Sequence, residues 1–290
     1  MTTIPAALMF VIQGSVIALG LALGLDAGVD DLLYLVTRPV KLARAFLAIC
    51  IIVPAAALAL TRILPVIGPV KAGAILMALA PVPPVLPPRG LRLGAGRTYM
   101  YGLYVTFVVL TVITVPVTVE VLSRIYHVQA HVPIPRLARD LVVTVLAPVA
   151  IGMFVRGRWP ETAGRFAPHL ERISTILLTA LVALVIAASW RQLVVLIGNG
   201  ALLAMLGVVA IGVICGHLLG GPDPDKRPAL AMAAGMRHPG IALMIAEANF
   251  PDKRVRAAIV LFTLVGVIVI TLYKSVMQHR GPRPPLRVVR

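Results

Sequence analysis

The chain alternates long apolar stretches with short polar connections. Nine stretches rich in Leu, Val, Ile and Ala approach the roughly 20 residues that a helix needs to cross about 30 Å of hydrocarbon. They lie near residues 6–25, 42–60, 66–86, 98–120, 140–156, 173–190, 193–220, 229–250 and 257–277. This pattern predicts an all-α polytopic membrane protein with about nine transmembrane helices.

Composition supports this class. The 290 residues are 59% hydrophobic and 13% charged, whereas soluble domains average about 45–50% apolar and about 25% charged residues. The connections near 121–139 and 157–172 are too short for a soluble domain. We therefore expect one transmembrane domain over residues 1–277, with a front half of about 1–120, a back half of about 140–277 and a basic cytoplasmic tail at 278–290.

The net charge of +16 comes mainly from Lys and Arg in the connections. Alternate connections carry about twice as many of these residues as the others, and such excess marks the cytoplasmic side. We expect an integral protein of the bacterial inner membrane, with the N-terminus outside and the C-terminus in the cytoplasm. The lipid bilayer is its expected partner, and no basic patch interleaved with aromatic residues indicates nucleic acid. The oligomeric state is left open.

Two apolar stretches are interrupted. One contains the run Pro81-Val-Pro-Pro-Val-Leu-Pro-Pro88, and the other is broken around Gly235-Met-Arg-His-Pro-Gly240. Each precedes a long unbroken stretch, so the two occupy matching places in the front and back halves. Interrupted segments at matching positions indicate inverted repeats and a secondary transporter working by alternating access. The alternative is one kinked helix and one Pro-rich surface loop.

Arg237 stands in the middle of an apolar stretch, where a charge costs about 2.5–3.5 kcal/mol on insertion scales. Its fixed charge, with the N-terminal dipole of a half-helix starting at Gly240, predicts binding of a carboxylate or sulfonate. The alternatives are an ion pair with Glu247 or Glu120, or a side chain that reaches the interface. The candidate substrate-binding residues are Pro81, Pro83, Pro84, Gly235, Arg237, His238, Pro239, Gly240 and Asn249.

Glu247 is a candidate carrier of a coupling proton, because a lone carboxyl group in lipid is protonated or paired. It could equally lie at the headgroup boundary, since Asp252, Lys253 and Arg254 follow soon after it.

The run Gly235-Met-Arg-His-Pro-Gly-Ile-Ala-Leu, followed by Ala248-Asn-Phe-Pro251, resembles the second crossing helix of the bile acid:sodium symporter family. The stretch Gly20-Leu-Ala-Leu-Gly-Leu and the prolines Pro54, Pro81 and Pro116 also match the family's pattern. The resemblance implies two inverted repeats arranged as a panel and a core, with two crossed, broken helices in the core. It also implies transport of a small or amphipathic organic anion. The nine stretches resemble the family's nine-span members, which lack the first of its ten helices.

The chain departs from that family where sodium would bind. Sodium-using members carry a Glu and a Gln where this chain has Ala233 and Arg237. A second family Gln corresponds to Ile49 if Pro54 is the counterpart of the family's proline. Sodium prefers oxygen ligands, and a second cation at contact distance repels it. The resemblance therefore implies no metal site and no cofactor, with Arg237 replacing the charge of sodium.

Other function classes find less support. No Gly-x-Ser-x-Gly or His-Glu-x-x-His motif is present, so we do not expect an enzyme. The sequence also has no P-loop motif, so we do not expect transport driven by ATP through this chain. Cys50 and Cys215 lie in apolar stretches and are interpreted as packed small side chains. A non-transporting receptor or sensor on the same scaffold stays open, because lost cation ligands would suit it too.

Overall fold

The computed structural model describes residues 6–126, 130, 132–198 and 200–279, and the described chain folds into helices without a strand. Two of the segments, η1 and η2, are π-helical turns inside longer helices. In chain order the elements are α1 (Ala6–Asp26), α2 (Val29–Leu33), α3 (Pro39–Phe46), η1 (Leu47–Ile52), α4 (Val53–Ile63), α5 (Gly68–Leu79), α6 (Leu86–Leu91), α7 (Arg97–Tyr126), α8 (Ile134–Leu141), η2 (Val142–Leu146), α9 (Ala147–Arg158), α10 (Pro160–Leu196), α11 (Ala201–Leu219), α12 (Lys226–Gly235), α13 (Pro239–Asn249) and α14 (Lys253–His279).

The predicted membrane class is confirmed. Six stretches of the described chain are long and apolar enough to cross a bilayer: Pro39–Ile63, Arg97–Ile125, Ile134–Arg158, Ala201–Leu219, Lys226–Asn249 and Lys253–Gln278. On α7 the exposed residues Val109, Ile113, Val117 and Val121 recur every four positions, which aligns them on one helix face suited to lipid. The full number of nine crossings stays a prediction.

Two predicted boundaries are wrong. The connection expected at 157–172 is mostly helical, because α10 begins at Pro160 and continues through this polar stretch. The stretch expected to start at 193 is divided, since α10 runs on to Leu196 and α11 begins only at Ala201. Gly198 and Gly200 have φ values of 152° and 79°, a conformation that glycine adopts readily and that ends the helix there. Most of the predicted tail, residues 280–290, lies outside the described part.

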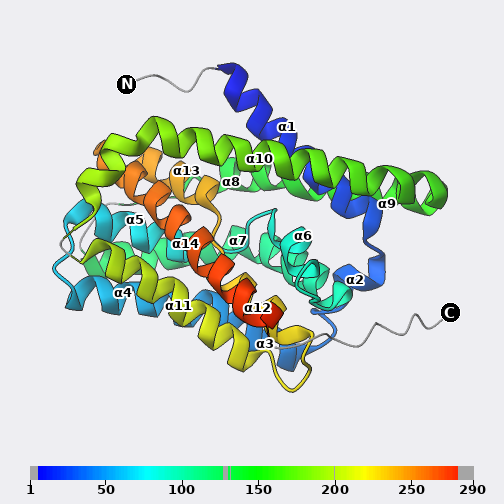
Figure 1. The fold of residues 1–290 in the computed structure, drawn as a ribbon, viewed down its shortest axis with the longest axis horizontal. Helices are drawn as coiled ribbons and strands as arrows, with labels where there is room; N and C mark the ends of the chain where they lie inside the picture. Colours follow the sequence, from blue (N-terminus) through cyan, green and yellow to red (C-terminus); the bar gives the residue numbers. More distant parts are fainter. Residues whose placement is uncertain (1–5, 127–129, 131, 199, 280–290) are drawn as a thin grey trace.

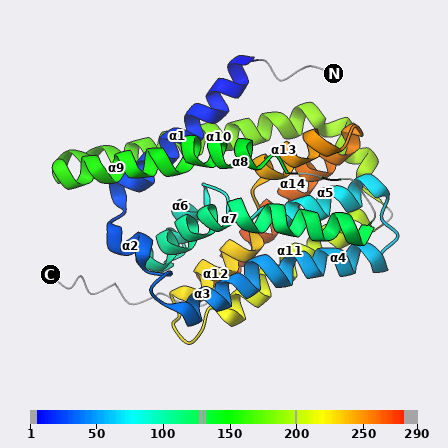
Figure 2. The same ribbon diagram turned by 180° about the vertical axis from the view of Figure 1, so that it is seen from behind.

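The helices form two layers (Figures 1 and 2). The upper layer in Figure 1, which we call the panel, contains α1, α8, η2, α9 and α10. The lower layer, which we call the core, contains α3, η1, α4, α5, α6, α7, α11, α12, α13 and α14. In the core, α5 packs on α14 and α12 packs on α7, so each interrupted segment contacts the long helix of the other half.

The second interrupted segment, α12 and α13, is the most enclosed of the six membrane-length stretches. Its apolar window is 72% buried inside the protein, compared with 28–44% for the other five. Unpaired backbone groups at a helix break cannot be satisfied by lipid and are tolerated only inside protein or beside water. The fold therefore places the break where its N–H and C=O groups can find protein partners.

Close packing of α12 depends on glycines in α11. Gly212 and Gly216 of α11 and Gly220, which caps its C-terminal end, are spaced four residues apart, so they lie on one face of the helix. A Cβ atom at Gly216 would lie 2.5 Å from the Leu230 carbonyl oxygen, and one at Gly212 would lie 2.7 Å from that of Ala234. This stripe of small residues lets the two backbones touch, as in many membrane helix pairs.

Candidate functional site

The two helix breaks meet inside the core. Helix α5 ends at Leu79 and α6 begins at Leu86, while α12 ends at Gly235 and α13 begins at Pro239. The backbone N–H of His238 donates a hydrogen bond of 3.0 Å to the Ala80 carbonyl oxygen. The halves also pair crosswise, since α5 contacts α13 and α6 contacts α12. The two interrupted segments therefore cross at their breaks.

Local sequence explains both breaks. Pro81, Pro83 and Pro84 have no N–H to continue α5, and all three are buried at the crossing. Between them Val82 has a φ of 32°, a strained conformation for a β-branched residue. At the second break, Pro239 takes the first position of α13, where its missing N–H costs nothing.

Two further candidates shape the second break. The His238 ring Nδ1 accepts a hydrogen bond of 3.3 Å from the Ile241 N–H and so caps α13. Gly235, the last residue of α12, is closely packed against α11, because a Cβ there would lie 2.6 Å from Val213 Cγ2. Gly240, in the first turn of α13, is exposed.

Arg237 lies in the break of the second segment with only 5% of its surface exposed. Its Nη1 donates to the carbonyl oxygens of Ile49 (3.1 Å) and Ala78 (3.2 Å), and its Nη2 donates to that of Ala234 (2.7 Å). Its Nε is buried and has no hydrogen-bond partner in the described chain. The ion pair with Glu247 or Glu120 considered as an alternative is absent, since neither carboxylate lies within 4.0 Å of this guanidinium.

The three carbonyl groups surround the Arg237 guanidinium with partial negative charge. Ala78 and Ala234 lie in the last turns of α5 and α12, where unpaired carbonyls carry the negative end of the helix dipole. Ile49 belongs to the π-helical turn η1. Carbonyls at half-helix ends are also the groups that coordinate sodium in transporters with interrupted helices. Ala233, fully buried on α12, adds no side-chain oxygen.

Glu247 and Asn249 lie away from the crossing. Both are near the far end of α13, so Glu247 is about 12 Å along the helix from Pro239 at 1.5 Å per residue. Glu247 is exposed, and Asn249 donates a hydrogen bond of 2.8 Å to the Ile245 carbonyl. The structure thus brings together the breaks, Arg237 and His238, and leaves these two residues outside the group.

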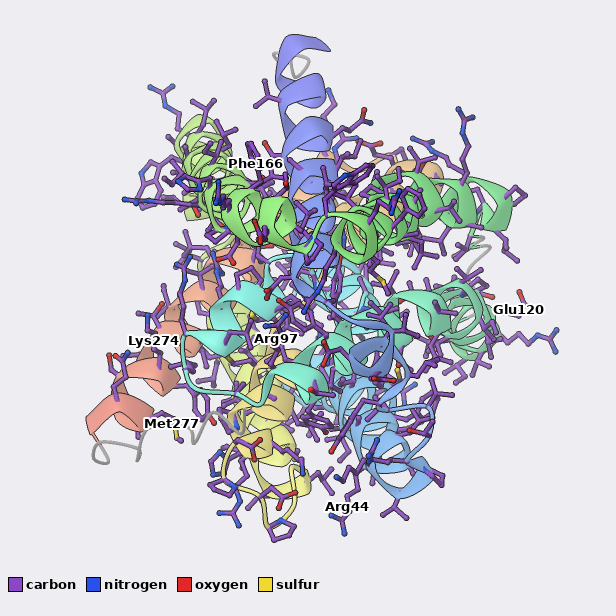
Figure 3. The ribbon with its side chains drawn as sticks, turned by 90° about the vertical axis from the view of Figure 1, so that its right-hand side faces the viewer. Arg44, Arg97, Glu120, Phe166, Lys274 and Met277 are labelled. Atoms are coloured by element: carbon purple, nitrogen blue, oxygen red, sulfur yellow. The ribbon has the colours of Figure 1, made fainter. Side chains whose placement is uncertain are left out.

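A second polar cluster joins the panel to the core at the right-hand end of Figure 1. Asp26, the last residue of α1, pairs with Arg97 of α7 (2.9 Å) and accepts a hydrogen bond of 2.6 Å from the Tyr101 hydroxyl. In Figure 3, which views this end, Arg97 lies near the centre, whereas Arg44 and Glu120 point outward. Separation of the two layers here has to break the Asp26 contacts. The sequence does not single out this cluster, because its only signal is Asp26, the acidic residue directly after the first apolar stretch.

Replacing Asp26 with Asn should loosen this end of the molecule. The stability cost should be only about 1 kcal/mol, because the ion pair is half-exposed and screened by solvent. Spin labels at Phe166 of α10 and Arg44 of α3 lie on opposite layers (Figure 3), and pulsed electron paramagnetic resonance should show longer label distances in the variant. Arg97→Gln should act alike, and Glu120→Gln should not. Unchanged distances in both variants would mean that these contacts do not hold the layers together.

Comparison with known proteins agrees with this architecture. A search of curated proteins gives no match. A family model described as the sodium bile acid symporter family matches residues 15–196, which run from within α1 to the end of α10, and Arg237 lies beyond the match. The match covers more than half of the chain, and the helical class and membrane-length helices fit it. The chain therefore belongs to the sodium bile acid symporter family.

Proposed function

We propose that this family member is a secondary transporter of a small or amphipathic organic anion that operates without sodium. Membership supports a membrane transporter of the bile acid symporter type. The panel and the core would move against each other to expose the anion alternately on the two sides of the bacterial inner membrane. The connections richer in Lys and Arg would face the cytoplasm, with the N-terminus outside and the C-terminus in the cytoplasm.

The observation that carries the proposal is the setting of Arg237. Its guanidinium donates to carbonyls at the ends of two half-helices and in η1, where a bound cation would find its oxygen ligands. A sodium ion at contact distance from this guanidinium would be repelled by several kcal/mol at low dielectric. Arg237 would supply permanently the charge that sodium brings to other transporters.

The anion would bind near the crossing. The buried Nε of Arg237 has a hydrogen to donate and no partner in the part of the chain described. The N-terminal end of α13, capped by His238, lies beside it and favours negative charge. Pro81, Pro83, Pro84, Gly235, Pro239 and Gly240 would shape this site, and Asn249 would contribute only if the anion reached along α13.

Flux into reconstituted vesicles tests the proposal. Taurocholate and pyruvate serve as amphipathic and small probes, with sodium outside replaced by potassium. We expect equal initial rates in the two salts, because no sodium site has to be filled. A collapse of flux in potassium would refute sodium independence and leave transport standing. A proton gradient imposed on the same vesicles tests Glu247, since Glu247→Gln should abolish any acceleration by that gradient.

A second candidate function is a receptor or sensor on the transporter scaffold. The replacement of the family's sodium ligands by Ala233 and Arg237 favours it too, because a protein that no longer transports has no need to bind sodium. Binding of a probe anion without flux in either salt would support this alternative and refute the transporter.

A further inference from the structure

Helices α3 and α12 both begin with positively charged side chains, where the helix dipole disfavours them. Lys41 lies in the first turn of α3, and Lys226 and Arg227 are the first two residues of α12. Neither first turn contains an acidic residue, and the N-cap residues Arg38 and Asp225 make no side-chain hydrogen bond to their helices. A helix start carries partial positive charge and unpaired N–H groups, so an anion stabilises it and a cation destabilises it. Both helix starts therefore have positive charge that their first turns do not neutralise.

The starts of α3 and α12 lie at the lower edge of the core (Figures 1 and 2) and meet at Tyr34, the residue after α2. Lys41 Nζ donates a hydrogen bond of 2.8 Å to the Tyr34 hydroxyl, which donates none in the described chain. Lys226 is close enough to Tyr34 and Lys41 to interact with both, and its side chain is only 15% exposed. The Tyr34 ring lies edge-on to that of Tyr99 in α7, and its centroid is 3.8 Å from Arg38 Cζ. Lysine and phenol groups from three elements thus converge in a partly enclosed place.

Five cations gather here, and we call Arg38, Lys41, Arg44, Lys226 and Arg227 the basic cluster. Arg227 Nε donates a hydrogen bond of 2.8 Å to the Gly221 carbonyl oxygen. Arg44 reaches the same glycine, because a Cβ at Gly221 would lie 3.0 Å from Arg44 Nη1. Asp223 is the one carboxylate of the described chain within 4.0 Å of the cluster, and it pairs with Lys226. The basic cluster therefore holds more positive charge than this carboxylate neutralises.

We propose that the basic cluster binds a phosphate group, the chemistry that an anionic phospholipid headgroup and free phosphate share. Lys41, Lys226 and the Tyr34 hydroxyl donate to the phosphate oxygens, and the positive ends of α3 and α12 favour the same charge. The connections before α3 and before α12 are two that we expect on the cytoplasmic side, where basic pockets between membrane helices bind lipid headgroups. A bound phosphate thus joins the starts of α3 and α12.

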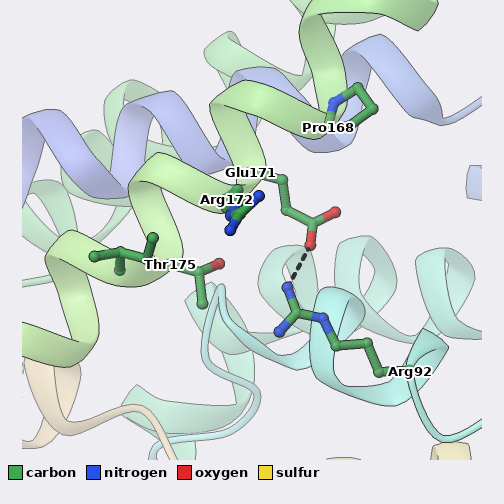
Figure 4. A pocket seen from close by; sticks show the side chains of 6 residues that line it. Arg92, Pro168, Glu171, Arg172 and Thr175 are labelled. Carbon is green, nitrogen blue, oxygen red and sulfur yellow. Dashed lines mark hydrogen bonds and ion pairs between the residues drawn. The ribbon is translucent and has the colours of Figure 1, made fainter.

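This phosphate site is separate from the helix breaks. Its residues belong to or adjoin α2, α3 and the start of α12, whereas Arg237 follows the opposite end of α12. None of them lines the recess between the layers, where Arg92 Nη2 pairs with Glu171 Oε1 at 3.1 Å (Figure 4). The site therefore does not depend on which anion the protein transports.

Native mass spectrometry of the purified protein in an uncharged detergent measures the preference directly. Phosphatidylglycerol and phosphatidylcholine with the same acyl chains are titrated in turn, and the ratio of their affinities for the first bound lipid is taken. We expect the wild type to prefer phosphatidylglycerol, because the choline group of the other lipid cancels the charge of its phosphate. A variant that is only loosened loses affinity for both lipids, so its ratio stays the same.

Lys41→Gln and Lys226→Gln should each lower the ratio about fivefold, as expected for one lysine near an anionic headgroup. Tyr34→Phe keeps the ring and removes the hydroxyl, so it should lower the ratio as well. The matched control is Lys274→Gln, which removes a partly buried lysine from the C-terminal third of α14. Lys274 lies well away from Arg44 in Figure 3, and its loss should leave the ratio unchanged.

Inorganic phosphate separates the two sources of the phosphate group. Thermal unfolding is followed in millimolar phosphate and in chloride of equal ionic strength, since a ligand of the folded state raises its stability. A rise that depends on Lys41, without a preference for phosphatidylglycerol, would assign the site to free phosphate, whereas a lipid ratio that depends on Lys41 would assign it to a headgroup. A lipid ratio and an unfolding temperature that both ignore Lys41 and Lys226 would overturn the proposal. So would an equal drop of the ratio in Lys274→Gln, because the preference would then come from net charge alone.

Discussion

Replacing Arg237 with Ala is expected to destabilise the protein by about 1–3 kcal/mol for each buried carbonyl group that loses its donor. The substitution leaves three buried carbonyls, those of Ile49, Ala78 and Ala234, without their donor. Two of these carbonyls lie at the C-terminal ends of half-helices, where the helix dipole is negative. The substitution would leave these negative ends without a compensating positive charge. Thermal unfolding of the purified protein in detergent measures the loss.

The same variant tests whether Arg237 stands in for a cation. With the guanidinium gone, the carbonyls are free to bind an external cation, and ligand binding to the folded state raises its stability. The unfolding temperature of Arg237→Ala should rise with sodium or with millimolar guanidinium, whereas that of the wild type should be the same in sodium and potassium. Arg237→Lys keeps the charge but loses the planar fork of donors, so we expect only partial recovery. A variant as stable as the wild type and indifferent to cations would rule out this role.

The all-α membrane class and the two helix breaks could be predicted from the sequence, because membrane helices and their interruptions have strong local causes. Apolar length predicts spans, and the prolines at 81, 83 and 84 cannot continue a helix whatever surrounds them. The wrong boundaries have equally local reasons. The segment from Pro160 to Arg172 is too polar for a membrane window, yet it is rich in helix-forming Ala, Glu and Arg.

The partners of Arg237 could not be predicted in the same way. Every residue carries a carbonyl group, so Ile49, Ala78 and Ala234 have no side-chain signature for this role. Ile49 stood out only as a position where the family's amide is missing. The panel–core contacts are similarly hidden, because Asp26 and Arg97 pair across 71 positions of sequence. Such contacts depend on how the layers pack, which hydrophobic patterning does not encode.

The packing of α11 on α12 supports a second large effect, expected for Gly216→Val. A Cβ at Gly216 would also lie 2.7 Å from the Ala231 Cα, so valine forces the two helices apart. Overpacking of this kind costs about 1–3 kcal/mol and occasionally more, and a backbone obstacle that cannot rotate away places this case at the upper end. Thermal unfolding should show the loss.

Gly266→Val provides the matched control, because a Cβ at Gly266 in α14 meets nothing within 4 Å. The two variants add the same side chain to membrane-length helices, so their difference isolates the contact with α12. Since α12 carries the Ala234 carbonyl and leads directly into Arg237, Gly216→Val should also reduce taurocholate or pyruvate flux, whichever the wild type supports. Equal stability of the two variants would show that α11 and α12 are not packed backbone to backbone. The packing of α11 on α12 would then not be what holds Arg237 in place against the three carbonyl groups.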